Sequence, residues 1–396
     1  GDAEKLDYID VRNRIVMERG AAVAGGAAVA GGAADASRRA APVVGLVHSF
    51  LTLRMYPLYS TFLRELGCTI VESDGLVPEA ANRKVTSMCF PADVSLMLFE
   101  NVLEKHPDYV FIPHAKELYV PGGIQRIDFC TTCAFSQGEA FWLRGAYRDR
   151  DVKLVAPTVN FNGGWERGRE PFVEAAREMG FDREAAVAAF DAAVRSQYEA
   201  EAAVKAEGQK LLDELHADPE RTAVVVFGRP YNAYAPEANK GIPRKLTSRG
   251  QLVIPFEMLP YDDEPLSEEY GEYMHWEAGQ RILRAAQIVE RDPQLFGLYI
   301  TNFLCAPDSF LVSFFRRTMG TKPSLTLELD AHTADAGINT RIEAFIDIVR
   351  NYRRTQLAAM KGVDDGFRPA EVRFEHNGIV YVDSDAREAG RGGVDE

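Results

Sequence analysis

Short apolar runs rich in β-branched residues alternate along this chain with longer segments of helical spacing. The short runs lie at 43–50, 68–73, 109–113 and 153–157, and again at 222–227, 251–254, 298–302 and 324–329. Helical patterns of about 10–15 residues between such runs indicate a parallel sheet, because each crossover helix covers one of its faces. The sequence therefore predicts an α/β fold with two doubly wound lobes of Rossmann or flavodoxin type, whose parallel sheets face a central cleft.

Changes in composition along the chain predict its division. Residues 1–41 combine a short charged helix at 5–19 with an Ala/Gly-rich linker that contains two glycine pairs. Glycine pairs destabilise a helix and favour a flexible linker, which would suit a tail or a junction within a larger polypeptide. We expect the first lobe at 42–164, a helical crossover at 165–220, the second lobe at 221–354, and a charged C-terminal tail at 355–396 with a hairpin near His376.

Composition and charge narrow the function classes. The 396 residues carry a net charge of −14, which argues against nucleic acid or an anionic membrane surface as the main partner. No apolar run of about 18 residues predicts a transmembrane helix, and the first residues lack a signal-peptide pattern. Five cysteines in a chain of this length do not form a disulfide scaffold, so a reducing cytoplasm is expected.

Four of the five cysteines stand where predicted helices begin. Cys305 follows a predicted strand, and both Cys305 and Cys89 have a proline two residues later, as expected in a first helical turn. Cys130 and Cys133 precede another helical pattern. A helix N-terminus is expected to lower a thiol's pKa and to suit the thiol for binding a metal. Cys68, by contrast, opens a strand that should be buried, and we expect an inert core thiol there.

The four helix-associated thiols are expected to converge if the two lobes face one another. Ligands of open α/β sheets bind at the carboxyl ends of the strands, which is where these cysteines are predicted to lie. Soft thiolates without a histidine at zinc spacing favour an iron–sulfur cluster over zinc. Two alternatives stay open: the cysteines could be small buried residues, or they could form a structural zinc site.

A polar segment follows the first strand of the second lobe. Arg229 in this segment could hold an anion, and Tyr231 and Asn232 beside it could contact a substrate. A plain strand-to-helix turn is the competing interpretation. No Walker A loop, GxGxxG fingerprint or nucleophile elbow is present, so we do not expect the chain alone to bind ATP or a dinucleotide in the usual way.

A second polar set stands at the end of the last predicted strand. Glu328, Asp330 and His332 alternate along the chain, so we expect them to share one face and to form an acid–base set or a hydrogen-bonded support for a cluster. Their expected partners are Arg341 and Glu343 on the next helix. The competing interpretation is a turn in which the following residue, Thr333, is the helix N-cap.

Together these motifs resemble one family, the uncharacterised domain of CoA-substrate-specific enzyme activases, which is related to the 2-hydroxyacyl-CoA dehydratase subunits. The resemblance spans roughly 43–350. The residues that carry it are 45–59 with Phe62 and 66–67, 89–91, Cys133, 228–232, Trp276 with 279–282, 302–303, Cys305, 307–310 and 330–341.

The resemblance implies a 4Fe-4S cluster held by three cysteines, which here are Cys89, Cys133 and Cys305, with one iron open to water, a thiol or a substrate carbonyl. Cys130 departs from the family pattern and could close the fourth site, which would make the cluster an electron relay rather than a catalyst. Leu304, beside Cys305, stands where the family more often has glycine, as does residue 306, and these side chains could narrow access to the cluster.

The resemblance also implies partners and an activity. An ATP-hydrolysing activator, as a domain or a separate protein, would inject a low-potential electron, and an acyl-CoA-type molecule would be the substrate. The predicted function is ATP-driven low-potential electron transfer or reductive acyl-CoA-type chemistry in the cytoplasm. The alternatives are a non-catalytic docking domain for the activator and a structural zinc protein, and whether the chain is a dimer stays open.

Overall fold

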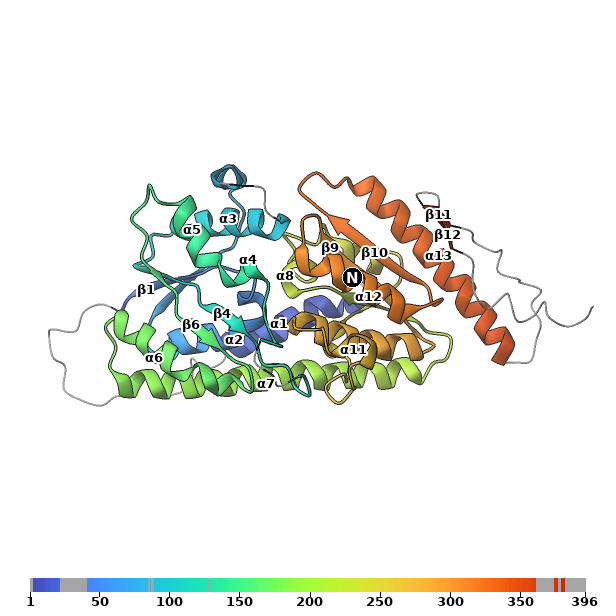
Figure 1. Ribbon diagram of the computed structural model, residues 1–396, viewed down its shortest axis with the longest axis horizontal. Coiled ribbons are helices and arrows are strands. Elements are labelled where there is room, and N and C mark those ends of the chain that lie inside the picture. Colours follow the sequence, from blue (N-terminus) through green and yellow to red (C-terminus); the bar gives the residue numbers. More distant parts are fainter. Residues whose placement is uncertain are drawn as a thin grey trace, which may run out of the picture. The chain divides into compact units, whose positions relative to one another are not determined.

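The computed structural model describes residues 3–21, 41–84, 86, 89–124, 126, 128–360, 374–376 and 379–381, so the predicted Ala/Gly linker lies almost wholly outside the described residues. The chain forms two compact units, 1–347 and 348–396, which are described separately below. The first unit contains two α/β lobes, coloured blue to green and yellow to orange in Figure 1. Among the described residues, none of the helices is both long enough and apolar enough to span a membrane.

The first lobe is built on a four-stranded parallel sheet with strand order β2-β1-β3-β5. Its strands are β1 (Val43–Leu46), β2 (Thr69–Glu72), β3 (Tyr109–Phe111) and β5 (Leu154–Val155), and its helices are η3 (Pro78–Arg83), α2 (Thr52–Glu65), α3 (Phe90–Leu103), α4 (Ala134–Gln137) and α5 (Glu139–Ala146). The helical pattern that follows Cys133 forms two helices, α4 and α5, which meet at Gly138. A short parallel pair, β4 (His114–Glu117) and β6 (Thr158–Asn160), was not predicted, because these strands are brief and largely polar.

The second lobe repeats this architecture with strand order β10-β9-β7-β8, again all parallel. Its strands are β7 (Ala223–Phe227), β8 (Leu252–Pro255), β9 (Leu295–Asn302) and β10 (Ser324–Leu329), and its helices are α8 (Pro230–Ala233), α9 (Ile242–Thr247), η5 (Phe256–Met258), α10 (Glu268–Gly271), α11 (Glu277–Arg291) and α12 (Ala306–Met319). Every residue of β7 and β9 is buried, as expected for central strands covered on both faces. The prediction of two doubly wound parallel lobes is confirmed.

Helices outside the two sheets connect and support the lobes. The crossover consists of η4 (Trp165–Gly168), α6 (Arg169–Glu178) and α7 (Arg183–His216), and α7 runs beneath both lobes in Figure 1. An N-terminal η1 (Glu4–Leu6) leads into α1 (Tyr8–Ala21), which packs against α2, α7 and β8. The N-terminal helix is therefore part of the first compact unit, although the sequence placed it beside a linker.

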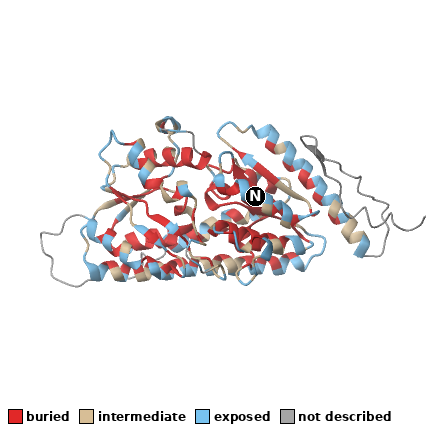
Figure 2. Cartoon of the chain, in the orientation of Figure 1, coloured by how far each residue is buried: buried red, intermediate tan, exposed pale blue. Residues whose placement is uncertain are grey.

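Aromatic side chains tie the crossover to the first lobe. The ring centroids of Phe62 on α2 and Phe172 on α6 are 5.0 Å apart, and Phe172 lies equally close to Phe190 on α7. Figure 2 shows buried residues concentrated in the strands and on the inner faces of these helices. The crossover helices thus complete the core of the first lobe.

The last helix, α13 (Asp335–Met360), begins in the first unit and ends in the second. The second unit also contains β11 (Phe374–His376) and β12 (Ile379–Tyr381), which form an antiparallel pair. This pair confirms the hairpin expected near His376.

Candidate functional site

Three cysteines are the N-cap residues of helices. Cys89 precedes α3, Cys133 precedes α4 and Cys305 precedes α12, and all three have an extended backbone. The Sγ atom of Cys305 accepts a hydrogen bond from the backbone N–H of Asp308 at 3.4 Å. The prediction that these three residues stand at helix starts is therefore confirmed.

Arg229 and Tyr231 are the shared neighbours of these three thiols. Arg229 follows β7, which pairs in the sheet with β9, the strand that leads to Cys305. Its Nη2 atom donates to the Sγ atom of Cys305 at 2.5 Å. Tyr231 packs with Cys89 in a buried cluster, and Cys133 lines a small cavity together with both Arg229 and Tyr231. Thiols from both lobes therefore adjoin one buried pair of side chains.

The loop that carries Arg229 depends on the glycine before it. Gly228 has a φ of +137°, and a Cβ atom there would lie 2.5 Å from the carbonyl oxygen of Ile300 on β9. Only glycine combines this backbone angle with such a close approach. The close packing of the two strand ends brings Arg229 to Cys305.

Asp308 holds the Arg229 guanidinium in place. Its carboxylate accepts hydrogen bonds from Arg229 Nη2 at 2.9 Å, from the hydroxyl of Tyr299 at 3.0 Å and from the hydroxyl of Thr301 at 2.5 Å. The Asp308 and Arg229 side chains are only 2% and 5% exposed, so this ion pair is shielded from water. Three donors on one carboxylate fix the position of the positive charge beside Cys305.

Sequence reasoning did not identify this carboxylate network, although signals for it exist. Asp308 is the third residue of α12, where an acidic side chain faces the positive end of the helix. Tyr299 and Thr301 alternate along β9 and therefore point to the same side of the sheet. A search for polar alternation within the buried strand would have found both.

Burial is the largest influence on the pKa values of two of the thiols. It raises the pKa of Cys89 to about 11, with a further rise from the neighbouring Cys133. It raises the pKa of Cys305 to about 12, although Arg229 acts in the opposite direction. The prediction of lowered pKa values is wrong for both residues, because the loss of water around a thiolate outweighs the helix N-terminus and the arginine. Binding of a metal to these thiols would release their protons.

Cys130 does not begin a helix, because α4 starts at Ala134 directly after its N-cap Cys133, so the prediction of a fourth cysteine at a helix start is wrong. The Cys130 thiol is fully buried, donates to the carbonyl oxygen of Ile124 at 3.5 Å and lies 4.0 Å from Nε2 of Gln280. Burial raises the pKa of Cys130 to about 12. Cys68 is also buried, and burial raises its pKa to about 12, in keeping with an inert thiol. The strand after Cys68 is a half-exposed edge strand, however, so the expectation of a buried strand is wrong.

Three buried polar atoms around the Arg229 loop have no hydrogen-bond partner within the described part of the chain. They are Arg229 Nε, Asn232 Nδ2 and Asn302 Oδ1. The two amides share one hydrogen bond, from Asn302 Nδ2 to Asn232 Oδ1 at 2.6 Å. Rotating both side-chain amides by half a turn, so that nitrogen and oxygen exchange places, would still leave one nitrogen and one oxygen without a hydrogen bond. Buried polar atoms are normally paired, so these atoms indicate a place suited to a ligand.

The side chains around the three thiols differ in arrangement from a site for a single metal ion. No three or more His, Cys, Asp or Glu side chains among the described residues are arranged to hold a metal ion. The chemistry of these residues nevertheless fits an iron–sulfur cluster. The protein ligands of a cluster stand farther apart than the protein ligands of a single metal ion. Three thiols adjoin the same pair of side chains, and Arg229 Nε and Asn232 Nδ2 are N–H donors of the kind that bind cluster sulfides.

The predicted acid–base set does not share one face. β10 ends at Leu329, so the alternation stops before Asp330. The Asp330 carboxylate accepts from the backbone N–H of His332 at 2.9 Å and from the hydroxyl of Thr333 at 2.7 Å, which closes a turn. His332 is exposed, whereas Glu328 lines an open cavity of about 570 Å³ beside Cys305.

The two expected partners of this set lie elsewhere. Arg341 donates to the carbonyl oxygen of Thr326, and Glu343 pairs with Arg249. Thr333 closes the turn at the strand end rather than capping α13, which begins at Asp335. The turn interpretation therefore describes this segment better than the acid–base interpretation.

Leu304 has an unusual backbone. Its φ is +61°, in the left-handed region that favours glycine, and its side chain is 66% exposed. It lines the open cavity beside Cys305 together with Phe303. The turn into α12 thus places an apolar side chain at this opening.

A family model described as the CoA enzyme activase uncharacterised domain matches residues 43–259, more than half of the chain. The matched segment contains Cys89, Cys133 and Arg229 and ends before Cys305. No curated protein matches the chain.

Proposed function

Because the chain belongs to the family of the CoA enzyme activase uncharacterised domain, we propose that it is an iron–sulfur protein in which Cys89, Cys133 and Cys305 hold a 4Fe-4S cluster. Its function would be ATP-driven low-potential electron transfer or reductive acyl-CoA-type chemistry. The observation that carries this proposal is the shared position of the three thiols. All are helix N-caps, they come from both lobes, and they adjoin Arg229 and Tyr231.

The side chains around the thiols would serve such a cluster in distinct ways. The bound cluster supplies one-electron transfer at low potential. Arg229, held by Asp308, offsets part of the negative charge of three thiolates, and the helix N-termini add to this effect. Asn232 Nδ2 and Arg229 Nε provide N–H groups that have no other partner in the described chain.

The open cavity beside Cys305 is the proposed approach for a substrate. It has a volume of about 570 Å³, and Arg316 and Glu328 stand on its wall. A cation there could bind an acidic group of an acyl-CoA-type molecule. An ATP-hydrolysing activator is the proposed source of the electron.

Cluster assembly under strictly anaerobic conditions tests the proposal. The purified chain is reconstituted, assayed for iron and acid-labile sulfide, and examined by EPR after reduction. We expect about four iron and four sulfide per chain, as in a cubane cluster. Cys89→Ala, Cys133→Ala and Cys305→Ala should lose the cluster. Cys68→Ala, a buried thiol elsewhere, is the matched control and should retain it.

Each result has a distinct meaning. A wild-type chain that takes up no iron, or only zinc, contradicts the proposal. Cys130→Ala should leave the EPR signal unchanged, because the Cys130 thiol has other neighbours. A changed signal in that variant would identify a fourth cysteine ligand and favour an electron relay over a catalyst. Reduction of the cluster by an activator protein only in the presence of ATP tests the proposed partner.

A further inference from the structure

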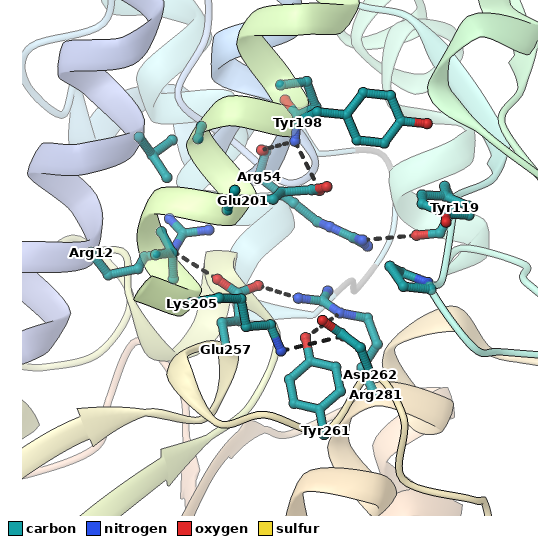
Figure 3. A pocket seen from close by; sticks show the side chains of 16 residues that line it. Arg12, Arg54, Tyr119, Tyr198, Glu201, Lys205, Glu257, Tyr261, Asp262 and Arg281 are labelled. Atoms are coloured by element: carbon teal, nitrogen blue, oxygen red, sulfur yellow. Dashed lines mark hydrogen bonds and ion pairs between the residues drawn. The ribbon is translucent and has the colours of Figure 1, made fainter. Parts of the chain in front are cut away.

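A cavity of about 250 Å³ along α7 is lined by charged side chains that bind one another (Figure 3). Glu257 accepts from Arg12 Nε at 2.7 Å and from Arg281 Nη2 at 2.5 Å. One oxygen of Glu277 lies 2.6 Å from Arg54 Nη1 and 3.5 Å from Arg281 Nη1, so three arginines share two carboxylates. Within the described residues, none of the buried side-chain atoms that lack a hydrogen bond belongs to this wall. The buried polar groups of this cavity therefore satisfy one another.

The open cavity beside Cys305 differs in this respect. Asn302, the last residue of β9, lines this cavity and is only 5% exposed. Its Nδ2 atom donates to Asn232 Oδ1 at 2.6 Å, but within the described part of the chain its own Oδ1 atom receives no hydrogen bond. A buried carbonyl oxygen without a donor is unfavourable. A ligand that brings a donor to Asn302 would therefore be bound favourably.

The amide pair of Asn232 and Asn302 lies at a point where sheets of this kind bind ligands. The strand order β10-β9-β7-β8 places β8 on one side of β7 and β9 on the other. Open α/β sheets bind ligands outside the carboxyl ends of the strands at such a switch point. Asn232 lies in α8 directly after β7, and Asn302 ends β9, so both amides stand at this point of the second lobe.

The proposed cluster does not supply the donor that this amide pair requires. Cluster sulfides and cysteine thiolates accept hydrogen bonds, as does the oxygen of Asn302. If nitrogen and oxygen exchange places in both amides, the oxygen without a donor belongs to Asn232 instead. In either orientation, one buried oxygen therefore requires an O–H or N–H group that the described residues do not provide.

The wall of the open cavity also carries a cation. Arg316 on α12 is exposed there, and within the described residues it forms no ion pair. A guanidinium binds a carboxylate through two parallel hydrogen bonds. Glu328 is exposed on the same wall and disfavours a second acidic group on the ligand. The wall thus combines a partner for one carboxylate with a buried acceptor for an O–H or N–H group.

We propose that Asn302 is a specificity-determining residue of the open cavity beside Cys305. Its side-chain oxygen accepts a hydrogen bond from a hydroxyl or an amide N–H of an organic monocarboxylate, whose carboxylate lies at Arg316. This inference rests on the proposed role of the cavity as the approach for a substrate, and it does not require a bound cluster.

Titration of the full chain with two pairs of acids of nearly equal shape tests the proposal. Lactate and 2-fluoropropionate differ in a hydroxyl donor, and N-acetylglycine and acetoxyacetate differ in an amide N–H. Binding is measured by calorimetry under anaerobic conditions, before and after cluster reconstitution. In at least one pair, we expect the donor-bearing acid to bind at least about tenfold more tightly, because its analogue leaves the oxygen of Asn302 unpaired. The pair that shows this ratio identifies the donor as a hydroxyl or an amide.

A double variant locates the discrimination between the two acids of a pair. Asn232→Leu combined with Asn302→Leu replaces both amides by apolar side chains of similar shape, so neither amide is left buried alone. This variant should lose the affinity ratio while its circular dichroism spectrum remains that of the wild type. Asn351→Leu makes the same change at an exposed position of α13 outside the cavity, and it should retain the wild-type ratio.

Three results would overturn the inference. The first is no saturable binding of any of the four acids at millimolar concentration. The second is equal affinity within both pairs, which would show that an ordered water rather than the ligand serves Asn302. The third is a ratio that persists in the folded double variant. Iron and sulfide are assayed on the same samples, so a chain without a cluster contradicts the proposed function, whereas equal affinities contradict this inference.

Discussion

Glu257→Gln removes one charge from the middle of a buried ion network. Glu257 is 6% exposed and accepts hydrogen bonds from both Arg12 and Arg281. Burial acts to raise the pKa of Glu257, but the charges of Arg12 and Arg281 outweigh burial and lower it to about 2. The ionised carboxylate is therefore strongly preferred in the folded chain.

The size of this preference gives the expected loss of stability. The pKa falls from an ordinary 4.5 to about 2, and each unit corresponds to about 1.4 kcal/mol, so the ionised form contributes about 3 kcal/mol to the free energy of unfolding. Glutamine has the shape of the protonated acid but no charge. We expect Glu257→Gln to lower the free energy of unfolding at pH 7 by about 3 kcal/mol.

The same pair of variants should differ in pH dependence. Because the pKa of Glu257 is lower in the folded state, its contribution is complete above pH 4.5 and is lost as the pH falls toward about 2. Wild type should lose this contribution across that window, whereas Glu257→Gln has none to lose. The stability difference between them should therefore shrink in acid.

Urea unfolding followed by tryptophan fluorescence and by circular dichroism measures the effect, and coincident transitions justify a two-state treatment. The control is Glu170→Gln, which removes an exposed ion pair with Arg183 at 2.7 Å and should leave stability unchanged. A Glu257→Gln variant within about 0.5 kcal/mol of wild type would refute the reasoning, because that is the range of neutral surface substitutions.

Two backbone predictions concern the loops that flank the thiols. Leu304→Gly should stabilise the chain by about 0.5–1 kcal/mol, because it removes the strain of a left-handed backbone at a non-glycine residue and the leucine side chain that is lost is mostly exposed. A lower urea midpoint for this variant than for the wild type would contradict this prediction. Gly228→Ala should destabilise it by about 1–3 kcal/mol, because the new Cβ would meet the carbonyl of Ile300 at an unfavourable φ. A wild-type melting temperature for Gly228→Ala would show that the loop can shift without cost.

Local signals predicted the parts of the site that depend on the chain's own geometry. The alternation of apolar runs and helices indicated the two parallel sheets, because it reflects burial on both faces of a strand. Proline two residues after Cys89 and Cys305 indicated helix N-termini, since proline is favoured in the first turn. The prediction from side-chain alternation was wrong at Asp330, because the strand ends one residue earlier and the chain then turns.

What the sequence by itself determined is the order of the strands and helices along the chain and the cysteines that begin helices, because propensity, capping and periodicity act over a few residues. Only the tertiary structure decided the pKa values of Cys89 and Cys305, the contact of Arg229 with Cys305, and the sharing of two carboxylates by three arginines. Arg12 and Glu257 stand 245 positions apart in the chain. Their charges interact strongly only because packing removes the water between them.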